Sequence, residues 1–172
     1  MEIELSDIPN RIKVLEDKIS GCEEDIKIYL NNKAEYDEEA RKALRSTIYN
    51  AIIDNELSTE EVYICDYQGF RLIVPTNIVR DQAYLYVEGY SKYHVDMGNT
   101  ELGTIVRLDN FLERLPKIKD DYLETKNKLL KKENDLKQEL SKDNYYAEII
   151  ERLEVELKKI DEVLGVEIKW VN

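Results

Sequence analysis

Apolar residues at alternating spacings of four and three constrain the fold of this 172-residue chain more than any other feature. Such spacing places side chains on one helix face and is typical of coiled coils. The N-terminal stripe comprises Ile8, Ile12, Leu15, Ile19 and Cys22. A second stripe comprises Phe111, Leu115, Ile118, Tyr122, Leu129, Leu136 and Leu140, and a third comprises Tyr146, Ile150, Leu153, Leu157, Ile160 and Leu164. We therefore expect long helices that pack against one another.

The two C-terminal stripes are separated by Asp143-Asn144, a pair typical of turns. This predicts an antiparallel helical hairpin over residues 100–165, in which Pro116 restarts the first helix and Gly165 ends the second. The N-terminal helix, over residues 1–25, would be a third member of the bundle. The same stripes could instead join two copies of the chain into a homodimer.

Residues 26–99 carry short β-rich runs separated by turn sequences, which predicts hairpins beside one further helix. The first hairpin would lie within 26–36, and Asp37-Glu38-Glu39 would open the helix that follows it, since acidic residues suit the first turn. The second hairpin would turn at Asp66-Tyr67-Gln68-Gly69.

In a third hairpin, a loop at Glu88-Gly89-Tyr90 would pair Val87 with Ser91, Leu85 with Tyr93, and Ala83 with Val95. One face would then be apolar. The other face would carry Tyr84, Tyr86, Lys92, His94 and Asp96. A different loop length would reverse the two faces.

The chain is thus predicted to be one α+β domain over residues 1–172. A small antiparallel sheet of hairpins would pack with long coiled-coil-like helices, and residues 166–172 would add an edge strand.

The charge is strongly negative and uneven. The net charge is −12, and residues 1–66 hold 17 acidic and 8 basic residues, whereas residues 117–164 hold 13 and 11. A negative front half repels phosphate, so direct DNA binding is disfavoured, while a basic protein surface would attract it. The acidity would also be explained by solubility alone.

The inventory of reactive residues matches no enzyme class. His94 is the only histidine, so a hydrolytic triad has one candidate base and no motif that supplies a nucleophile. One His and two distant Cys do not make a zinc site, and no glycine-rich phosphate-binding motif occurs. We therefore expect no catalytic residue, no cofactor and no metal, and hence a binding protein.

Two groups of residues are candidates for binding. The acidic group comprises Glu35, Asp37, Glu38 and Glu39, and the aromatic group comprises Tyr84, Tyr86 and Tyr90. Tyrosine is favoured at interfaces because it buries a large area at low entropy cost. The alternative is that these tyrosines are core residues, covered by the helices.

The cysteines and the first residues favour a cytoplasmic location. Cys22 and Cys65, without a secretory signal, indicate free thiols, although one disulfide between them stays open. The first residues lack a basic region followed by an apolar run, and no stretch has membrane-spanning length.

Three segments together resemble a known family. They are Arg11-Ile12-Lys13-Val14-Leu15-Glu16-Asp17-Lys18-Ile19, then Tyr67-Gln68-Gly69-Phe70, and then Gly98-Asn99-Thr100 through Ile105-Val106-Arg107-Leu108-Asp109-Asn110-Phe111-Leu112-Glu113-Arg114-Leu115-Pro116. In this order they resemble the C-terminal region of the large helicase–DNA methylase proteins of phages and conjugative elements. The third segment is the most specific, and it departs from that pattern by an insertion around Glu101–Gly103.

The resemblance implies a stand-alone copy of a non-catalytic tail from a mobile element. The chain has neither helicase motor nor methylase domain, so no catalytic residue is carried over. For Arg107 and Asp109, we expect a structural role that locks a helix onto the sheet.

Small acidic proteins of such elements often inhibit host defence. The first functional expectation is therefore an anti-CRISPR-type inhibitor that binds a nuclease effector, or its nucleoprotein complex, on the surface that holds nucleic acid. The alternative is a coiled-coil accessory or DNA-handling module that works beside a helicase or methylase.

Overall fold

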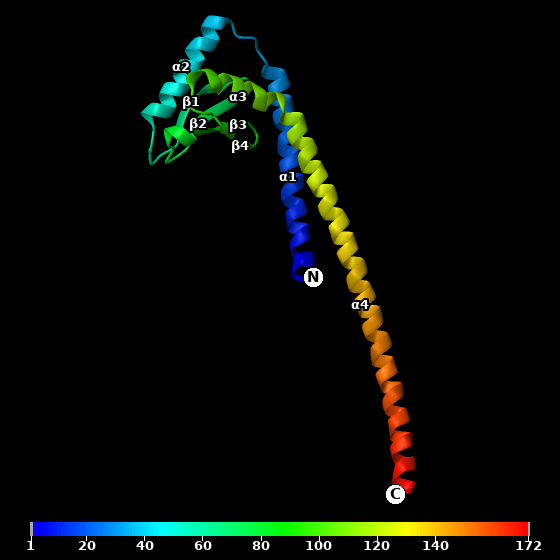
Figure 1. Ribbon diagram of the computed structural model, residues 1–172. Helices are drawn as coiled ribbons and strands as arrows, with labels where there is room; N and C mark the ends of the chain where they lie inside the picture. Colours follow the sequence, from blue (N-terminus) through cyan, green and yellow to red (C-terminus); the bar gives the residue numbers. More distant parts are fainter. Residues whose placement is uncertain (1, 172) are drawn as a thin grey trace. The chain divides into compact units, whose positions relative to one another are not determined.

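The computed structural model describes the backbone of residues 2–171 and the side chains of residues 4–164. The chain forms two compact units (Figure 1). The first is Lys13–Lys126, and the second combines residues up to Ile12 with residues from Asn127 onward.

The elements confirm the predicted α+β class, with four α-helices and a four-stranded antiparallel sheet. In chain order they are α1 (Glu2–Asn32), α2 (Glu38–Asp54), β1 (Val62–Tyr67), β2 (Phe70–Val74), the 3-10 helix η1 (Arg80–Gln82), β3 (Tyr84–Glu88), β4 (Lys92–Asp96), α3 (Glu101–Glu113) and α4 (Leu115–Val171). Among the described residues, no helix combines the length and the hydrophobicity that a membrane span requires.

The sheet has the simple order β1-β2-β3-β4. The β1–β2 hairpin is confirmed, and its turn consists of Gln68 and Gly69, with φ of 53° and 88°. Two successive positive φ values define the turn type that matches the twist of paired strands. The Gln68 side chain also holds the α1–α2 connection, because it accepts from the Ala34 N–H at 2.7 Å and donates to the Ala34 carbonyl at 3.0 Å.

The β3–β4 hairpin forms, but the predicted pairing was wrong by two residues. Leu85 pairs with Val95 and Val87 pairs with Tyr93, which leaves Gly89-Tyr90-Ser91 as the loop. A shift of two preserves the alternation of faces, so the assignment of apolar and polar faces is correct.

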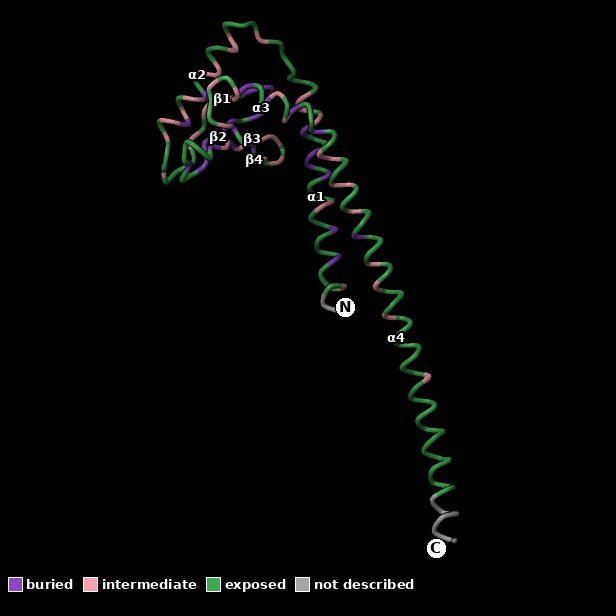
Figure 2. The backbone as a smooth tube through the Cα atoms, viewed as in Figure 1, coloured by how far each residue is buried: buried purple, intermediate pink, exposed green. Residues whose placement is uncertain are grey.

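The core lies between one face of the sheet and helices α2 and α3. Figure 2 shows buried segments gathered there and further ones along α1. The buried side chains include Leu72, Leu85 and Val87 from the sheet, Ile48 and Ile52 from α2, and Ile105, Leu108 and Leu112 from α3. Thr100 begins α3 by accepting from the Gly103 N–H, and the chain restarts as α4 beside Pro116, as predicted.

The predicted hairpin over residues 26–36 was wrong, because α1 continues to Asn32. Ile26 and Tyr29 extend the N-terminal stripe by the same spacing and pack against the core. This helical face outweighs the β-rich alternation over Ile26-Lys27-Ile28-Tyr29-Leu30 that suggested a strand. The Asn32 amide donates to the Ile28 carbonyl at 2.8 Å in the last turn.

The predicted helical hairpin over 100–165 was also wrong: α4 is one helix of 57 residues with no turn at Asp143-Asn144. The reason is that α1 packs against the face of α4 that a returning helix would have covered. Ion pairs join the two helices, Glu23 to Lys119 at 3.2 Å and Glu16 to Lys126 at 3.3 Å. Asp143 and Asn144 cost only about 0.5 kcal/mol each inside a helix, too little to break it.

Residues 166–171 are helical, so the predicted edge strand and the predicted stop at Gly165 were wrong; Asn172 lies outside the described residues. A strand needs a hydrogen-bonding neighbour, whereas a helix satisfies its own backbone groups. One glycine costs only about 1 kcal/mol within a helix.

Asp25 of α1 holds the β3–β4 loop. The carboxylate is fully buried and accepts from the Tyr90 N–H at 2.5 Å, the Ser91 N–H at 3.1 Å and the Tyr93 hydroxyl at 2.5 Å. Close approach requires glycine on the loop, since a Cβ at Gly89 would lie 2.4 Å from this carboxylate. With three hydrogen bonds to its buried carboxylate, Asp25 is the main polar contact between α1 and the β3–β4 hairpin.

Asp25→Ala should therefore lower the free energy of unfolding by about 3 kcal/mol, because it leaves buried donors without an acceptor. Glu24→Ala is the matched control: its neighbouring carboxylate pairs only with exposed Lys27, and its loss should cost less than about 0.5 kcal/mol. Urea denaturation measures both. Equal midpoints for the two variants would contradict this role of Asp25.

The phenols of the buried Tyr67 and the half-buried Tyr93 make the stability of the fold depend on pH in the alkaline range. Burial, and then a hydrogen bond to a carboxylate, raises the pKa of Tyr67 and of Tyr93 above the usual 10.0. The neutral phenol is favoured in the folded state, so its contribution is complete below pH 10 and declines as pH rises beyond it. Urea midpoints should fall more steeply above pH 10 for the unmodified chain than for Tyr93→Phe. The exposed control Tyr90→Phe should keep the full decline; identical slopes for all three chains would refute the assignment.

Candidate functional site

One face of the sheet packs against α2 and α3, and the opposite face is not covered by core residues. The side chains on it come from alternate positions of all four strands and include Tyr63, Arg71, Tyr84, Tyr86, Lys92, His94 and Asp96. Arg71, Lys92, His94 and Asp96 are exposed, and Tyr84 and Tyr86 are half-buried around the buried Ile73. We call these residues the open face. The structure thus places Tyr84 and Tyr86 on a surface rather than in the core beneath the helices.

The aromatic rings of the open face contact one another. Tyr84 stacks on His94 with ring centroids 3.8 Å apart, and its edge meets Tyr86 at 5.7 Å. A hydrogen bond with Tyr86 is also the main cause that raises the pKa of Tyr84. The Lys92 ammonium lies 4.2 Å from the Tyr86 ring centroid. Rings fixed by neighbours lose little further entropy when a partner binds.

The cations of this face are neutralised by carboxylates. Arg71 pairs with Glu88 at 2.9 Å, and Lys92 pairs with Glu61 at 2.9 Å. The bond to Glu61 is the main cause that raises the pKa of Lys92. With its cations already paired, the open face lacks the free positive charge that binds a phosphate backbone.

His94 lies on this face with Asp96, and its Nε2 is 3.2 Å from the Asp96 carboxylate. Both side chains are more than half exposed. One face of the imidazole ring is taken by the stack on Tyr84. In residues 4–164, no group of three or more His, Cys, Asp or Glu side chains gathers closely enough to hold a metal.

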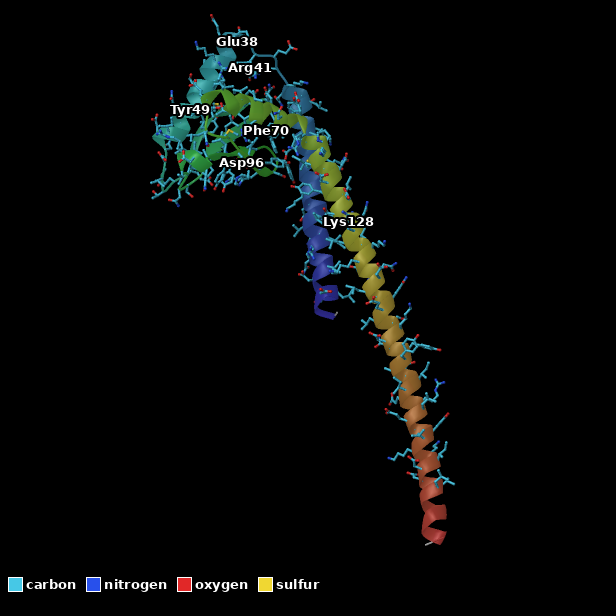
Figure 3. The ribbon with its side chains drawn as sticks, in the orientation of Figure 1. Glu38, Arg41, Tyr49, Phe70, Asp96 and Lys128 are labelled. Carbon is cyan, nitrogen blue, oxygen red and sulfur yellow. The ribbon has the colours of Figure 1, made fainter. Side chains whose placement is uncertain are left out.

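The acidic candidates lie elsewhere in the same unit. Glu35, Asp37, Glu38 and Glu39 are all exposed. Asp37 begins α2 by accepting from the Ala40 N–H at 2.7 Å, and the next two carboxylates lie in the first helical turn. Part of this charge is therefore used to stabilise the helix start. Figure 3 shows Glu38 well apart from Asp96 at the edge of the open face, so the two predicted groups do not form one site.

Tyr90 is also separate from the open face. It lies in the β3–β4 loop beside α1, where its ring edge would come within 3.3 Å of a Cβ at Gly21. Its side chain is 72% exposed. It can contact a partner, but only one that reaches the end of the hairpin.

Asp109 has the structural role expected for it. Its carboxylate accepts a short hydrogen bond from the Tyr67 hydroxyl and pairs with Arg41 at 3.0 Å. It thereby joins α3 to β1 and α2. Tyr36 stacks on the Tyr67 ring at 5.5 Å. No spacing in the sequence pairs Tyr67 with Asp109, because the two residues are 42 positions apart.

Arg107 lies over Gly98, where a Cβ would be 2.9 Å from its Nε. Gly98 has a φ of 71°, so both the backbone and this contact favour glycine. Arg107, Asn110 and Arg114 line one side of a cavity of about 420 Å³, and His94 and Asp96 line the other. The two arginines therefore share this cavity with Asp96, a residue of opposite charge on β4.

Both cysteines are free thiols. Burial raises the pKa of Cys22 and of Cys65, so neither is activated as a nucleophile. The Cys22 thiol donates to the Leu115 carbonyl at 3.4 Å, where α1 meets the start of α4.

Comparison with protein-family models, curated proteins and solved structures finds no match to this chain.

Proposed function

We propose that this chain is a non-catalytic binding protein of a phage or other mobile element, which acts in the cytoplasm of a bacterial host by attaching to another protein. The open face of the sheet carries this proposal. It presents Tyr63, Tyr84 and Tyr86 on a rigid, hydrogen-bonded support. Partly exposed tyrosines on a fixed backbone are typical of protein-binding surfaces.

The charge pattern favours a protein target over a nucleic acid. The cations of the open face are already paired, and the chain has a net charge of −12. Such a chain is attracted at long range to a basic protein surface.

The first target we propose is a host defence nuclease of the CRISPR type. Its nucleic-acid-binding surface is basic, because it must hold guide and target strands. The exposed carboxylates of Glu35, Asp37, Glu38 and Glu39 would accelerate the encounter, and Tyr84 and Tyr86 would supply the short-range contacts. Tyr90 would contact the target from the end of the hairpin.

Purified chain mixed with CRISPR effectors should form a complex and reduce DNA cleavage. Tyr84→Ala combined with Tyr86→Ala should weaken the inhibition at least about 10-fold, since buried interface tyrosines contribute more than about 1 kcal/mol each. Tyr145→Ala, an exposed tyrosine in the other unit, is the matched control and should inhibit normally. Unchanged cleavage at large molar excess across several effectors would refute this target.

A second candidate is an accessory module that docks beside a helicase or methylase of the same element. The observation that favours it is the apolar stripe on α4 from Tyr146 to Leu164, whose side chains are 48% to 62% exposed. A stripe of this length binds another helix in coiled coils.

Mixing the purified chain with the helicase and methylase encoded by its own element tests this second candidate. A complex that persists through size-exclusion chromatography, and that Leu153→Ser with Leu157→Ser disrupts, is expected. A complex that survives this double substitution would show that α4 is not the docking surface.

A further inference from the structure

The terminal part of α4 presents a complete coiled-coil stripe without a partner among the described residues. Its positions are Tyr146, Ile150, Leu153, Leu157, Ile160 and Leu164, and we call them the terminal seam. Each is about half exposed or more, whereas Leu129, earlier in the helix, is 7% exposed. Uncovered apolar side chains in such a row are typical of a binding surface.

The terminal seam continues an interface that exists within the chain. Leu115, Tyr122, Leu129 and Leu136 precede Ile150, Leu157 and Leu164 at multiples of seven residues. In the earlier part, α1 is the partner helix, and Glu4 of α1 pairs with Lys132 at 4.0 Å. Of the described ion pairs between α1 and α4, Glu4–Lys132 lies farthest along α4, and the terminal seam follows it.

The charged side chains of α4 are mainly basic in the part that packs against α1 and mainly acidic in the terminal part. Where α1 is the partner, α4 contributes Lys119, Lys126 and Lys132, each paired with a glutamate of α1. Residues 115–142 hold eight basic and six acidic side chains, whereas residues 143–164 hold three basic and seven acidic. The charged residues that flank the terminal seam at heptad positions e and g are Glu154, Glu156 and Asp161, all acidic.

This change in the sign of the charge determines which kind of helix can pair with the terminal seam. A second copy of the terminal seam would place acid against acid, and so would α1 of another copy, whose Glu4, Glu16 and Glu23 face lysines in its own chain. Like charges at flanking positions oppose coiled-coil pairing, and opposite charges select the partner. The three basic residues, Arg152, Lys158 and Lys159, occupy outer heptad positions and do not flank the seam.

We propose that the terminal seam binds an amphipathic helix of a partner protein that has apolar residues at its a and d positions and Lys or Arg beside them. Residues 143–164 form three heptads, about 33 Å of helix, which is enough for a specific coiled-coil contact. This inference rests on the proposed binding role but not on the open face.

Three synthetic peptides of three heptads test the proposal against the full chain by fluorescence anisotropy. The first has Leu and Ile at a and d with Lys at e and g; the second has Glu at e and g; the third keeps Lys but has Ala at a and d. The first should bind at least 10-fold more tightly than the other two. Equal binding of both Lys peptides would show attraction by charge alone, and preference for the Glu peptide would overturn the proposal.

Two triple variants with the same net charge test whether the heptad position of the acidic residues, and not only their number, selects the partner. Glu154→Lys with Glu156→Lys and Asp161→Lys should reverse the preference toward the Glu peptide. Glu148→Lys with Glu151→Lys and Glu162→Lys makes the same charge change at outer positions and should keep the preference for the Lys peptide. Circular dichroism verifies that both variants stay helical. If both triple variants behave alike, the flanking positions do not select the partner.

Sedimentation equilibrium tests the competing occupant. The chain should have the molar mass of a monomer at micromolar concentration, and a stable dimer abolished by Leu153→Ser with Leu157→Ser would show that a second copy covers the seam. The Tyr84→Ala with Tyr86→Ala variant should bind the Lys peptide normally. Failure of the peptide experiment would therefore leave the open face untouched, and failure of nuclease inhibition would leave the seam untouched.

Discussion

The packing of α1 is the contact on which the rest of the structure depends. In the first unit, one face of α1 meets the beginning of α4 through apolar residues and Glu–Lys pairs. Asp25 and Gly21, on the same helix, receive the β3–β4 loop. A single helix thereby fixes the end of the hairpin and occupies the stripe of α4. The described ion pairs with α1 lie between Lys119 and Lys132 of α4, and the apolar residues from Tyr146 to Leu164 are exposed.

The two faces of the sheet differ in what covers them. One face is covered by α2 and α3, while the other keeps Tyr84, Tyr86 and His94 accessible. The carboxylates beside Arg71 and Lys92 remove the positive charge that would suit nucleic acid. The open face and the terminal seam are the surfaces that we propose for partner proteins, and they differ in chemistry. The open face is aromatic and near neutral, whereas the terminal seam is aliphatic and acidic at its borders.

Much of the local structure was predictable, since it depends on short-range patterns. Alternation in β3 and β4 assigned Tyr84 and Tyr86 to the non-apolar face even though the pairing was wrong by two residues. The turn at Gln68-Gly69 and the helix start at Asp37 follow from local backbone preferences. The network of Asp109, Tyr67 and Arg41 could not be predicted as a contact, because its members come from three elements.

The sequence by itself determined which residues share a helix face, where the acid is concentrated and which strand positions are apolar, because each depends only on the period of a helix or strand. Tertiary structure decided what each face meets. The stripes at 8–22 and 115–136 pack together, and the stripe at 146–164 is left uncovered, although all three look alike in the sequence. The physical reason is that a heptad stripe specifies an apolar helix face but not the helix that packs against it. In this chain, the packing of α1 against the first part of α4 determines which stripes are buried.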